Sequence, residues 1–345
     1  MMMKKNFVFS MVAMIGVCLP ALSLAQFATP TEGFNNNGTR VAQFLKMAVG
    51  GRASAMGESY AAIANDASAL FWNPGGVGNL KNLEVHLTHM DYLLDITFDY
   101  AGLVVPLSSG NLGFSAAVLN AGEAHRTTIE DPDGEISGTW SATSVALGLT
   151  YSRALSDRFS VGVTGKYIRE GLFNSSASAV AIDIGSLYDT GIKGIRIGMA
   201  MTNFGGKMSL SGRDFTVRDV DVAPTLEGNN TPSGNLSVDE WPLPLNFRVG
   251  LSYEVFKNES GTLLLASDFV HPTDADERVN LGAEYSLSNK IYVRGGYKFN
   301  YDEESFTAGG GLNLPITTYN LMIDYAFQEF GILGETHRFS LGFRL

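Results

Sequence analysis

Cysteine is almost missing from this chain of 345 residues, because Cys18 is the only one. A disulfide or a cysteine-based metal site needs more than one cysteine, so the composition excludes both. Basic residues are also scarce: 24 Lys and Arg stand against 35 Asp and Glu, for a formal net charge of −11. Since a nucleic-acid-binding protein needs a positive surface, the charge argues against nucleic acid as a partner.

Long apolar runs are absent after residue 25. No stretch there reaches the roughly 18 consecutive apolar residues from which a transmembrane helix is predicted. Yet 45% of the chain is hydrophobic, only 17% is charged and 39 residues are glycine. The apolar residues must therefore be distributed in another pattern.

Motifs for catalysis or metal binding are also lacking. Five histidines are scattered along the chain without metal-site spacing, and no Gly-x-Ser-x-Gly elbow occurs. A phosphate loop that ends in Gly165-Lys166 would need its first glycine at position 160, where this chain has serine. Asp131–Glu135 could ligate calcium, but it lacks the spacing of a calcium loop, which favours an exposed turn. The sequence predicts neither an enzyme nor a metal or cofactor site.

The first 25 residues have the pattern of a secretory signal. Lys4 and Lys5 precede an apolar stretch at 7–22, and Ser23-Leu24-Ala25 is a small-x-small cleavage site. We therefore expect cleavage after Ala25 and a mature chain without cysteine. Retention as a membrane anchor is the alternative.

The apolar residues after residue 82 alternate with polar ones. In the segment 319–327, Tyr, Leu, Ile, Tyr and Phe fall on one face, and Asn, Met, Asp and Ala on the other. Segments of about ten residues that are apolar outside and polar inside are typical of membrane β-barrels. The sequence thus predicts an all-β, transmembrane outer-membrane β-barrel of about 14 antiparallel strands. A soluble β-sandwich is the alternative fold.

The predicted strands are joined by short turns at one end and longer loops, such as 121–138 and 205–243, at the other. Because bacterial barrels have short periplasmic turns, we expect both termini on the periplasmic side and the long loops outside. The predicted strands are 82–90, 95–105, 111–120, 139–153, 158–169, 176–187, 194–204, 244–255, 261–271, 278–286, 290–299, 305–313, 318–328 and 336–345.

The segment 43–78 differs from the rest, since it is rich in Gly, Ala and Ser and lacks the alternation. We expect one short helix over 67–72, with Asp66 as its N-cap. Pro74 should end it, because the residue before a proline is driven out of the helical region. A barrel of this many strands has a wide lumen, and this compact segment is predicted to plug it.

A family resemblance is carried by this segment. Residues 44–62, with Gly-Gly-Arg-Ala-Ser-Ala-Met-Gly-Glu-Ser-Tyr-Ala-Ala, and 65–76, ending in Asn-Pro-Gly-Gly, resemble the N-terminal signature of the PorV/PorQ family. That family is similar to the FadL-type outer-membrane channels, whose hatch has an Asn-Pro-Ala turn where this chain has Gly75. The resemblance implies a barrel plugged from inside. The hatch motif residues are Arg52, Gly57, Asp66, Asn73, Pro74 and Gly75.

The plug is expected to contact charged side chains on the inner face of the barrel. Acidic and basic side chains on that face could pair with each other and with Arg52, Glu58 and Asp66 of the plug. The expected domains are a signal peptide at 1–25, a hatch at 26–81 and a barrel at 82–345. The predicted inward charges are Glu84, His86, Asp99, Lys166, Asp183, Arg196, Arg248, Glu254, Asp268, Glu284, Arg294, Lys298, Asp324 and Arg338.

Two functions follow from the resemblance. The first, a PorV/PorQ-like role, implies a component of type IX secretion in the outer membrane of a Gram-negative bacterium, with the translocon and cargo proteins as partners. The alternative is a FadL-like channel for hydrophobic compounds such as long-chain fatty acids. Both imply contact with outer-membrane lipid, and the signature favours the first.

Overall fold

The computed structural model describes residues 37–192, 194–217, 234–258 and 261–345. The expected signal peptide and its cleavage site lie outside these residues. No helix among the described residues is long and apolar enough to cross a membrane.

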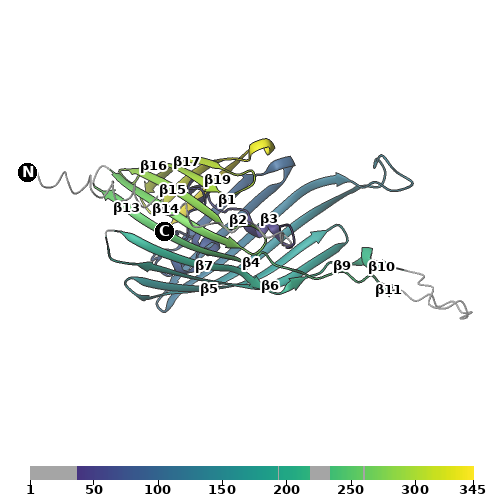
Figure 1. Cartoon of the computed structure of the whole chain (residues 1–345), viewed down its shortest axis with the longest axis horizontal. Helices are drawn as coiled ribbons and strands as arrows, with labels where there is room; N and C mark the ends of the chain where they lie inside the picture. The colour runs from purple at the N-terminus through teal and green to yellow at the C-terminus, as the bar shows by residue number, and fades with distance from the viewer. Residues whose placement is uncertain (1–36, 193, 218–233, 259–260) are drawn as a thin grey trace, which may run out of the picture. The chain divides into compact units, whose positions relative to one another are not determined.

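Fourteen antiparallel strands of the described chain close into a barrel (Figure 1). Each strand pairs with the next one in sequence, and β1 (Glu84–Asp91) pairs with β19 (Glu335–Arg344) to complete the ring. The predicted fold class and the fourteen predicted strands are confirmed. The others are β2 (Thr97–Leu107), β3 (Gly110–His125), β4 (Thr139–Ser156), β5 (Phe159–Leu172), β6 (Ser175–Asp189), β7 (Ile195–Gly205), β13 (Asn246–Lys257), β14 (Gly261–Pro272), β15 (Arg278–Leu287), β16 (Ile291–Phe299), β17 (Phe306–Ile316) and β18 (Tyr319–Glu329).

The two ends of the barrel differ in their connections. We call the end with residues 108–109, 157–158, 288–290 and 317–318 the turn end, and the opposite one the loop end. The longest loop-end connection, between β7 and β13, contains short elements. One exception to the expected pattern is the two-residue connection between β5 and β6 at the loop end. The short elements are β8 (Lys207–Met208), β9 (Ser211–Gly212), η3 (Arg213–Phe215), β10 (Thr216–Val217), β11 (Gly234–Asn235) and β12 (Trp241–Pro242); η2 (Leu93–Asp95) and η4 (Gly331–Leu333) lie in other loops.

Alternation along each strand separates the two faces of the sheet. In β1, Glu84, His86 and Met90 are buried, whereas Leu87 is exposed on the outside. The predicted inward position of Asp99 is wrong. Its neighbours Phe98 and Tyr100 fill the lumen, so alternation turns Asp99 outward, where it bonds to His89.

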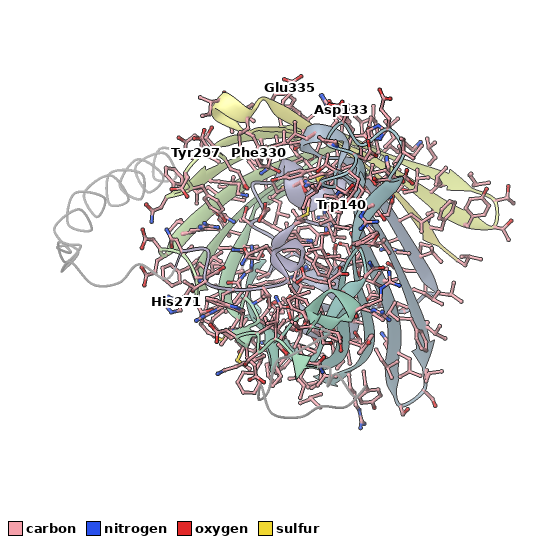
Figure 2. The ribbon with its side chains drawn as sticks, turned by 90° about the vertical axis from the view of Figure 1, so that its right-hand side faces the viewer. Asp133, Trp140, His271, Tyr297, Phe330 and Glu335 are labelled. Atoms are coloured by element: carbon pink, nitrogen blue, oxygen red, sulfur yellow. The ribbon has the colours of Figure 1, made fainter. Side chains whose placement is uncertain are left out.

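The lumen is filled by residues 42–80, which we call the luminal segment. Figure 2, drawn onto the loop end, shows its purple turns enclosed by strands. It contains η1 (Gln43–Lys46), α2 (Gly51–Ala55), α3 (Ala69–Trp72) and α4 (Pro74–Val77). Contacts of α2 with β18 and of α4 with β5 and β6 place the segment across the lumen.

The expectation of one helix with Asp66 as its N-cap is wrong in detail. Three short α-helices occur, and α3 starts after Ser68. Asp66 instead accepts the backbone N–H of Ser68 at 2.9 Å, which stabilises the turn ahead of the helix. Asn73 is extended (φ −158°), as the following proline requires, and Pro74 begins α4.

The chain enters the barrel from the loop end. The N–H of Val41 bonds to Pro242 O at 3.3 Å, and Gln43 and Lys46 each bond to Asp274 at 2.9 Å. Arg344, the penultimate residue of the chain, lies at the turn end, where it pairs with Glu84. The expectation that both termini lie on the periplasmic side stays a prediction, because residues 1–36 lie outside the described residues. The described part of the chain begins at the loop end.

Candidate functional site

The luminal segment is held by ion pairs to inward-facing strand residues. Arg52 on α2 forms a two-pronged bond with Glu284 on β15, at 2.8 and 2.9 Å. Glu284 also accepts from Arg294 at 2.7 Å, so two guanidinium groups share one carboxylate. Charge-assisted bonds of this geometry are among the strongest in proteins, which fixes α2 against the wall.

The pairing expected for Glu58 and Asp66 has two different outcomes. Glu58 bonds to Lys298 on β16 at 2.6 Å, so this contact joins the segment to the wall. Asp66 pairs within the segment instead, with Tyr60 at 2.8 Å and with Arg52 at 3.9 Å. Of the two carboxylates, only Glu58 fastens the segment to a strand.

The Asn73-Pro74-Gly75 turn packs against β5 and β6. The amide of Asn73 donates to Ala61 O at 2.7 Å and to Ser186 O at 3.0 Å, and its oxygen accepts the N–H of Gly75. A Cβ on Gly75 would lie 2.6 Å from Ser186 Cα. Gly75 is thus required by close backbone contact, which explains why this chain departs from Asn-Pro-Ala.

Gly57 takes a left-handed conformation (φ +62°). An added Cβ would lie 2.9 Å from Leu281 O and 3.0 Å from Tyr297 N, so the backbone touches β15 and β16. The N–H of Gly57 donates to Thr307 at 3.0 Å. All six predicted hatch residues therefore lie in the lumen, although Arg52 and Asp66 are the only two that contact each other as an ion pair.

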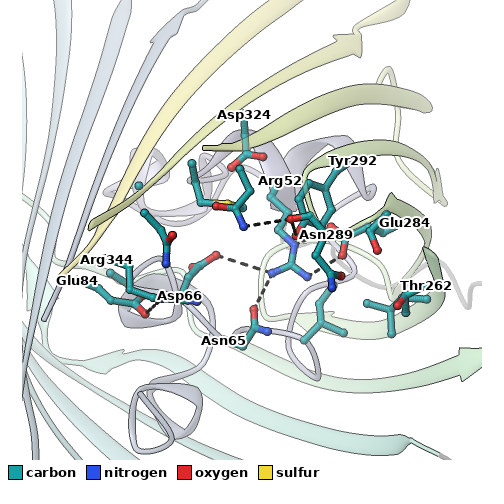
Figure 3. Close-up of a pocket in the computed structure, with 18 of the residues that line it drawn as sticks. Arg52, Asn65, Asp66, Glu84, Thr262, Glu284, Asn289, Tyr292, Asp324 and Arg344 are labelled. Carbon is teal, nitrogen blue, oxygen red and sulfur yellow. Dashed lines mark hydrogen bonds and ion pairs between the residues drawn. The ribbon is translucent and has the colours of Figure 1, made fainter. Parts of the chain in front are cut away.

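A polar cavity of about 330 Å³ lies between the segment and the turn end (Figure 3). In Figure 3, Arg52 reaches toward Asn65, Asp66 and Glu284, and Arg344 meets Glu84. These side chains bond to each other across the cavity. Most of the charge facing this space is therefore neutralised internally.

A second cavity, of about 440 Å³, lies at the loop end, and we call it the loop-end cavity. Its wall combines aromatic and aliphatic side chains with cations, a mixture that suits a small molecule with both apolar and polar parts. The apolar lining includes Phe44, Met47, Phe71, Trp72, Met90, Tyr92, Leu119, Val270 and Phe330; the cations are Lys46, Lys166, Arg248, Arg278, Lys298 and Arg338.

Two residues that line this cavity, Gln43 and Lys46, bond to Asp274 in the loop between β14 and β15. Partial burial acts to raise the pKa of the Asp274 carboxyl, but hydrogen bonds from Gln43 and Lys46 outweigh it, so the pKa lies below its ordinary value. The carboxylate therefore stays ionised at neutral pH and holds η1 in place.

The apolar lining of the loop-end cavity was not predicted. A signal for part of it exists in β1, because Met90 shares the inward face with Glu84, His86 and Thr88. An apolar residue on an otherwise polar inner face marks a site where the lumen is not simply hydrated. Among the described residues, no group of three or more His, Cys, Asp or Glu is arranged to hold a metal ion.

Comparison with known proteins gives one family match. Residues 21–187 match an uncharacterised protein family, UPF0164. A search of curated proteins finds no match.

Solved structures with a similar fold come from bacterial transporters. The toluene transporter TodX of Pseudomonas putida is 12% identical, covers 85% of this chain and 96% of its own, and has a TM-score of 0.54. TbuX, the toluene transporter of Ralstonia pickettii, is 13% identical, with coverage of 86% and 97% and a TM-score of 0.50. The CymD monoaromatic hydrocarbon channel is 12% identical, with coverage of 86% and 96% and a TM-score of 0.52. The chain has the barrel fold of these proteins.

Proposed function

We propose that the protein is an outer-membrane channel that admits small hydrophobic molecules, as in the FadL-like alternative. The observation that carries the proposal is the loop-end cavity, whose apolar wall lies on the side where bacterial barrels face the exterior. A porin for polar solutes has no need for such a wall. TodX and TbuX, which share the fold, are described as toluene transporters.

In this proposal, residues 1–25 are a signal peptide removed after Ala25, 26–81 are the plug and 82–345 are the barrel. The luminal segment lines both cavities, with Arg52 and Asp66 in the polar cavity and Phe44 and Trp72 in the loop-end cavity, and in this proposal it separates them. A molecule that passes from one cavity to the other therefore requires movement of this segment.

The test introduces a bulky side chain into the loop-end cavity. Thr202 on β7 lines it, whereas the adjacent Met201 lies on the opposite face of the strand. Thr202→Trp should cut uptake of a labelled hydrophobic compound severalfold in a Gram-negative host that lacks its own channel. Met201→Trp, the matched control, should leave uptake unchanged. Equal uptake by both variants, at equal amounts of heat-modifiable barrel, would contradict the proposal.

The PorV/PorQ-like role in type IX secretion stays a prediction from the resemblance. Its partners, the translocon and cargo proteins, were expected at loop 205–243, of which 218–233 lie outside the described residues. Trimming this loop should abolish surface display of cargo in a host with type IX secretion, but leave uptake intact. Intact display with reduced uptake would favour the channel.

A further inference from the structure

Three charged residues of the barrel that bind the luminal segment have a second ion-pair partner on the barrel itself. They are Lys298 on β16, Glu284 on β15 and Asp268 on β14, and all three are buried. Each is therefore bound at once by the luminal segment and by another residue of the barrel. We call that second barrel residue a spare counter-ion.

Lys298 lies between two carboxylates. Its ammonium group bonds to Glu58 of the luminal segment at 2.6 Å and also to Glu304, in the connection between β16 and β17. Glu304 accepts a further bond from Gln328 on β18 at 2.9 Å, so it is held in place without the segment. Because two like charges share one cation, their mutual repulsion weakens the hold of Lys298 on Glu58. This repulsion is relieved when the segment leaves.

Glu284 has the same arrangement with the signs reversed. It binds Arg52 of the luminal segment and Arg294 of β16, and Arg294 also bonds to Asp324 at 2.6 Å. When Arg52 leaves, Glu284 keeps Arg294, and Arg294 keeps Asp324. Arg52 in turn takes Asp66 with it, because that carboxylate lies 3.9 Å away on the same segment.

Asp268 binds the backbone of the luminal segment. It accepts the N–H groups of Tyr60 and Ala61 at 3.0 Å each, and it pairs with Arg248 on β13 at 3.2 Å. If the segment detaches, the carboxylate loses two hydrogen bonds but keeps its cation.

The arrangement at Asp274, at the loop end, is different. Both side chains that bond to it, those of Gln43 and Lys46, belong to the luminal segment. The Lys46 side chain is 28% exposed, so water can replace its carboxylate partner. The spare counter-ions thus stand beside buried charges of the strands, where a lost partner is harder to replace.

Breaking a buried ion pair is costly when one charge stays behind without a partner. At Lys298, Glu284 and Asp268 the charge that stays behind already has one. We propose that Glu304, Arg294 and Arg248 are positioning residues that keep these three charges paired when the luminal segment detaches, and so set how readily it detaches. The inference rests on the proposed function, because passage between the two cavities requires this movement.

Amide hydrogen exchange measures how often the segment detaches. The N–H groups of Gly51, Gly57, Tyr60 and Ala61 bond to barrel side chains, so we expect them to exchange only on detachment. The protein from Gln26 onward, refolded into nanodiscs, is followed by mass spectrometry, and peptides from β14, β15 and β16 report unfolding of the barrel. No ligand is used, so a failure here leaves the uptake proposal standing.

Removing a spare counter-ion should hold the segment more firmly. Glu304→Gln ends the competition for Lys298, so exchange of the four amides should slow severalfold. Glu303→Gln is the matched control, because this neighbouring carboxylate accepts the N–H of Ile332 at 3.4 Å instead, and exchange should not change. Faster exchange in Glu304→Gln would overturn the inference.

A double-mutant cycle isolates the competition between the two carboxylates. Glu58→Gln should speed exchange of the four amides in both backgrounds, by a factor about tenfold larger in Glu304→Gln than in the wild type. Equal factors would show that Glu58 and Glu304 act independently, against the inference. If Glu304→Gln does not assemble, Arg294→Gln decides at Glu284: slower exchange supports the inference, and unchanged or faster exchange overturns it.

Discussion

At the scale of single residues, close backbone contact fixes the Asn73-Pro74-Gly75 turn of the luminal segment. A Cβ on Gly75 would overlap the backbone of Ser186, and a Cβ on Gly162 would overlap Pro74, so neither position has room for a side chain. Asn73, fully buried, satisfies two carbonyls and one N–H with one side chain. Such a turn fits in only one position against β5 and β6.

Gly75→Ala tests this fit. The added methyl group would overlap Ser186, so we expect destabilisation of the docked turn by about 1–3 kcal/mol, as for other overpacked sites. Limited proteolysis of the refolded barrel should cleave the luminal segment faster in this variant. Gly165→Ala is the control, because a Cβ there meets nothing within 4 Å. Equal protection of Gly75→Ala and the wild type would show that the turn is not close-packed.

A second residue-scale prediction concerns pH and the loop 126–138. The carboxylate of Asp131 accepts the N–H groups of Ile136 (2.8 Å), Ser137 (2.7 Å) and Glu135 (3.1 Å). These bonds, first of all that from Ile136, lower the pKa of Asp131 from 3.8 to about 2. The stabilisation of the loop is therefore complete above pH 3.8 and is lost as the pH falls toward 2.

The loop should lose its fixed conformation over that pH window. A spin label on Asp133→Cys, in protein produced from Gln26 onward and so without Cys18, should become more mobile between pH 4 and pH 2. In the additional variant Asp131→Asn the label should be mobile already at pH 7. A label that stays immobile in Asp131→Asn would show that other contacts order the loop.

At the scale of elements, the alternation of apolar and polar residues correctly predicts which face of a strand each side chain occupies. It is local, so the sequence alone places Leu321 and Ile323 outside and Met322 inside, and the structure confirms this, with Met322 lining the polar cavity. The luminal helices could not be predicted in the same way. Their contacts join residues far apart in sequence, such as Asn73 and Ser186, and four-residue helices carry no periodicity of their own.

The wrong prediction for Asp99 also shows that alternation along a strand decides which face a residue occupies. Charge suggested an inward side chain, but the bulky Phe98 and Tyr100 on either side occupy the lumen. Periodicity therefore outweighs polarity in a strand. The loop-end cavity was missed because its wall is assembled from many separate strands and the luminal segment.

The register of β18 gives a prediction. Ile323→Arg would place a charge against lipid, at a cost of roughly 2–4 kcal/mol near the midplane. Met322→Arg, one residue away, would place it in the polar cavity and should be much milder. Heat-modifiable gel mobility after refolding reports the fraction of assembled barrel. Equal loss of assembly in both variants would disprove the assigned faces.

At the scale of the whole molecule, the ring of strand pairs is closed by strand residues alone, and the luminal segment contributes none of them. Deleting residues 44–78 removes no residue of any strand pair and none of the Arg248–Asp268, Arg294–Asp324 and Lys298–Glu304 pairs. We expect a barrel that still assembles, with a larger single-channel conductance in planar bilayers. Unchanged conductance would show that the segment does not obstruct the pore.

The direction in which the chain enters the barrel has a mechanical consequence. The luminal segment is tied to β1 at the turn end through Leu80 and Glu84, while its other end, at Val41 and Gln43, lies at the loop end. A pulling force applied to Val41 from the loop end would therefore break the contacts of the luminal segment one after another, starting at η1. The force would rise at the Arg52–Glu284 bond. The fourteen strands would stay paired while the luminal segment left the lumen.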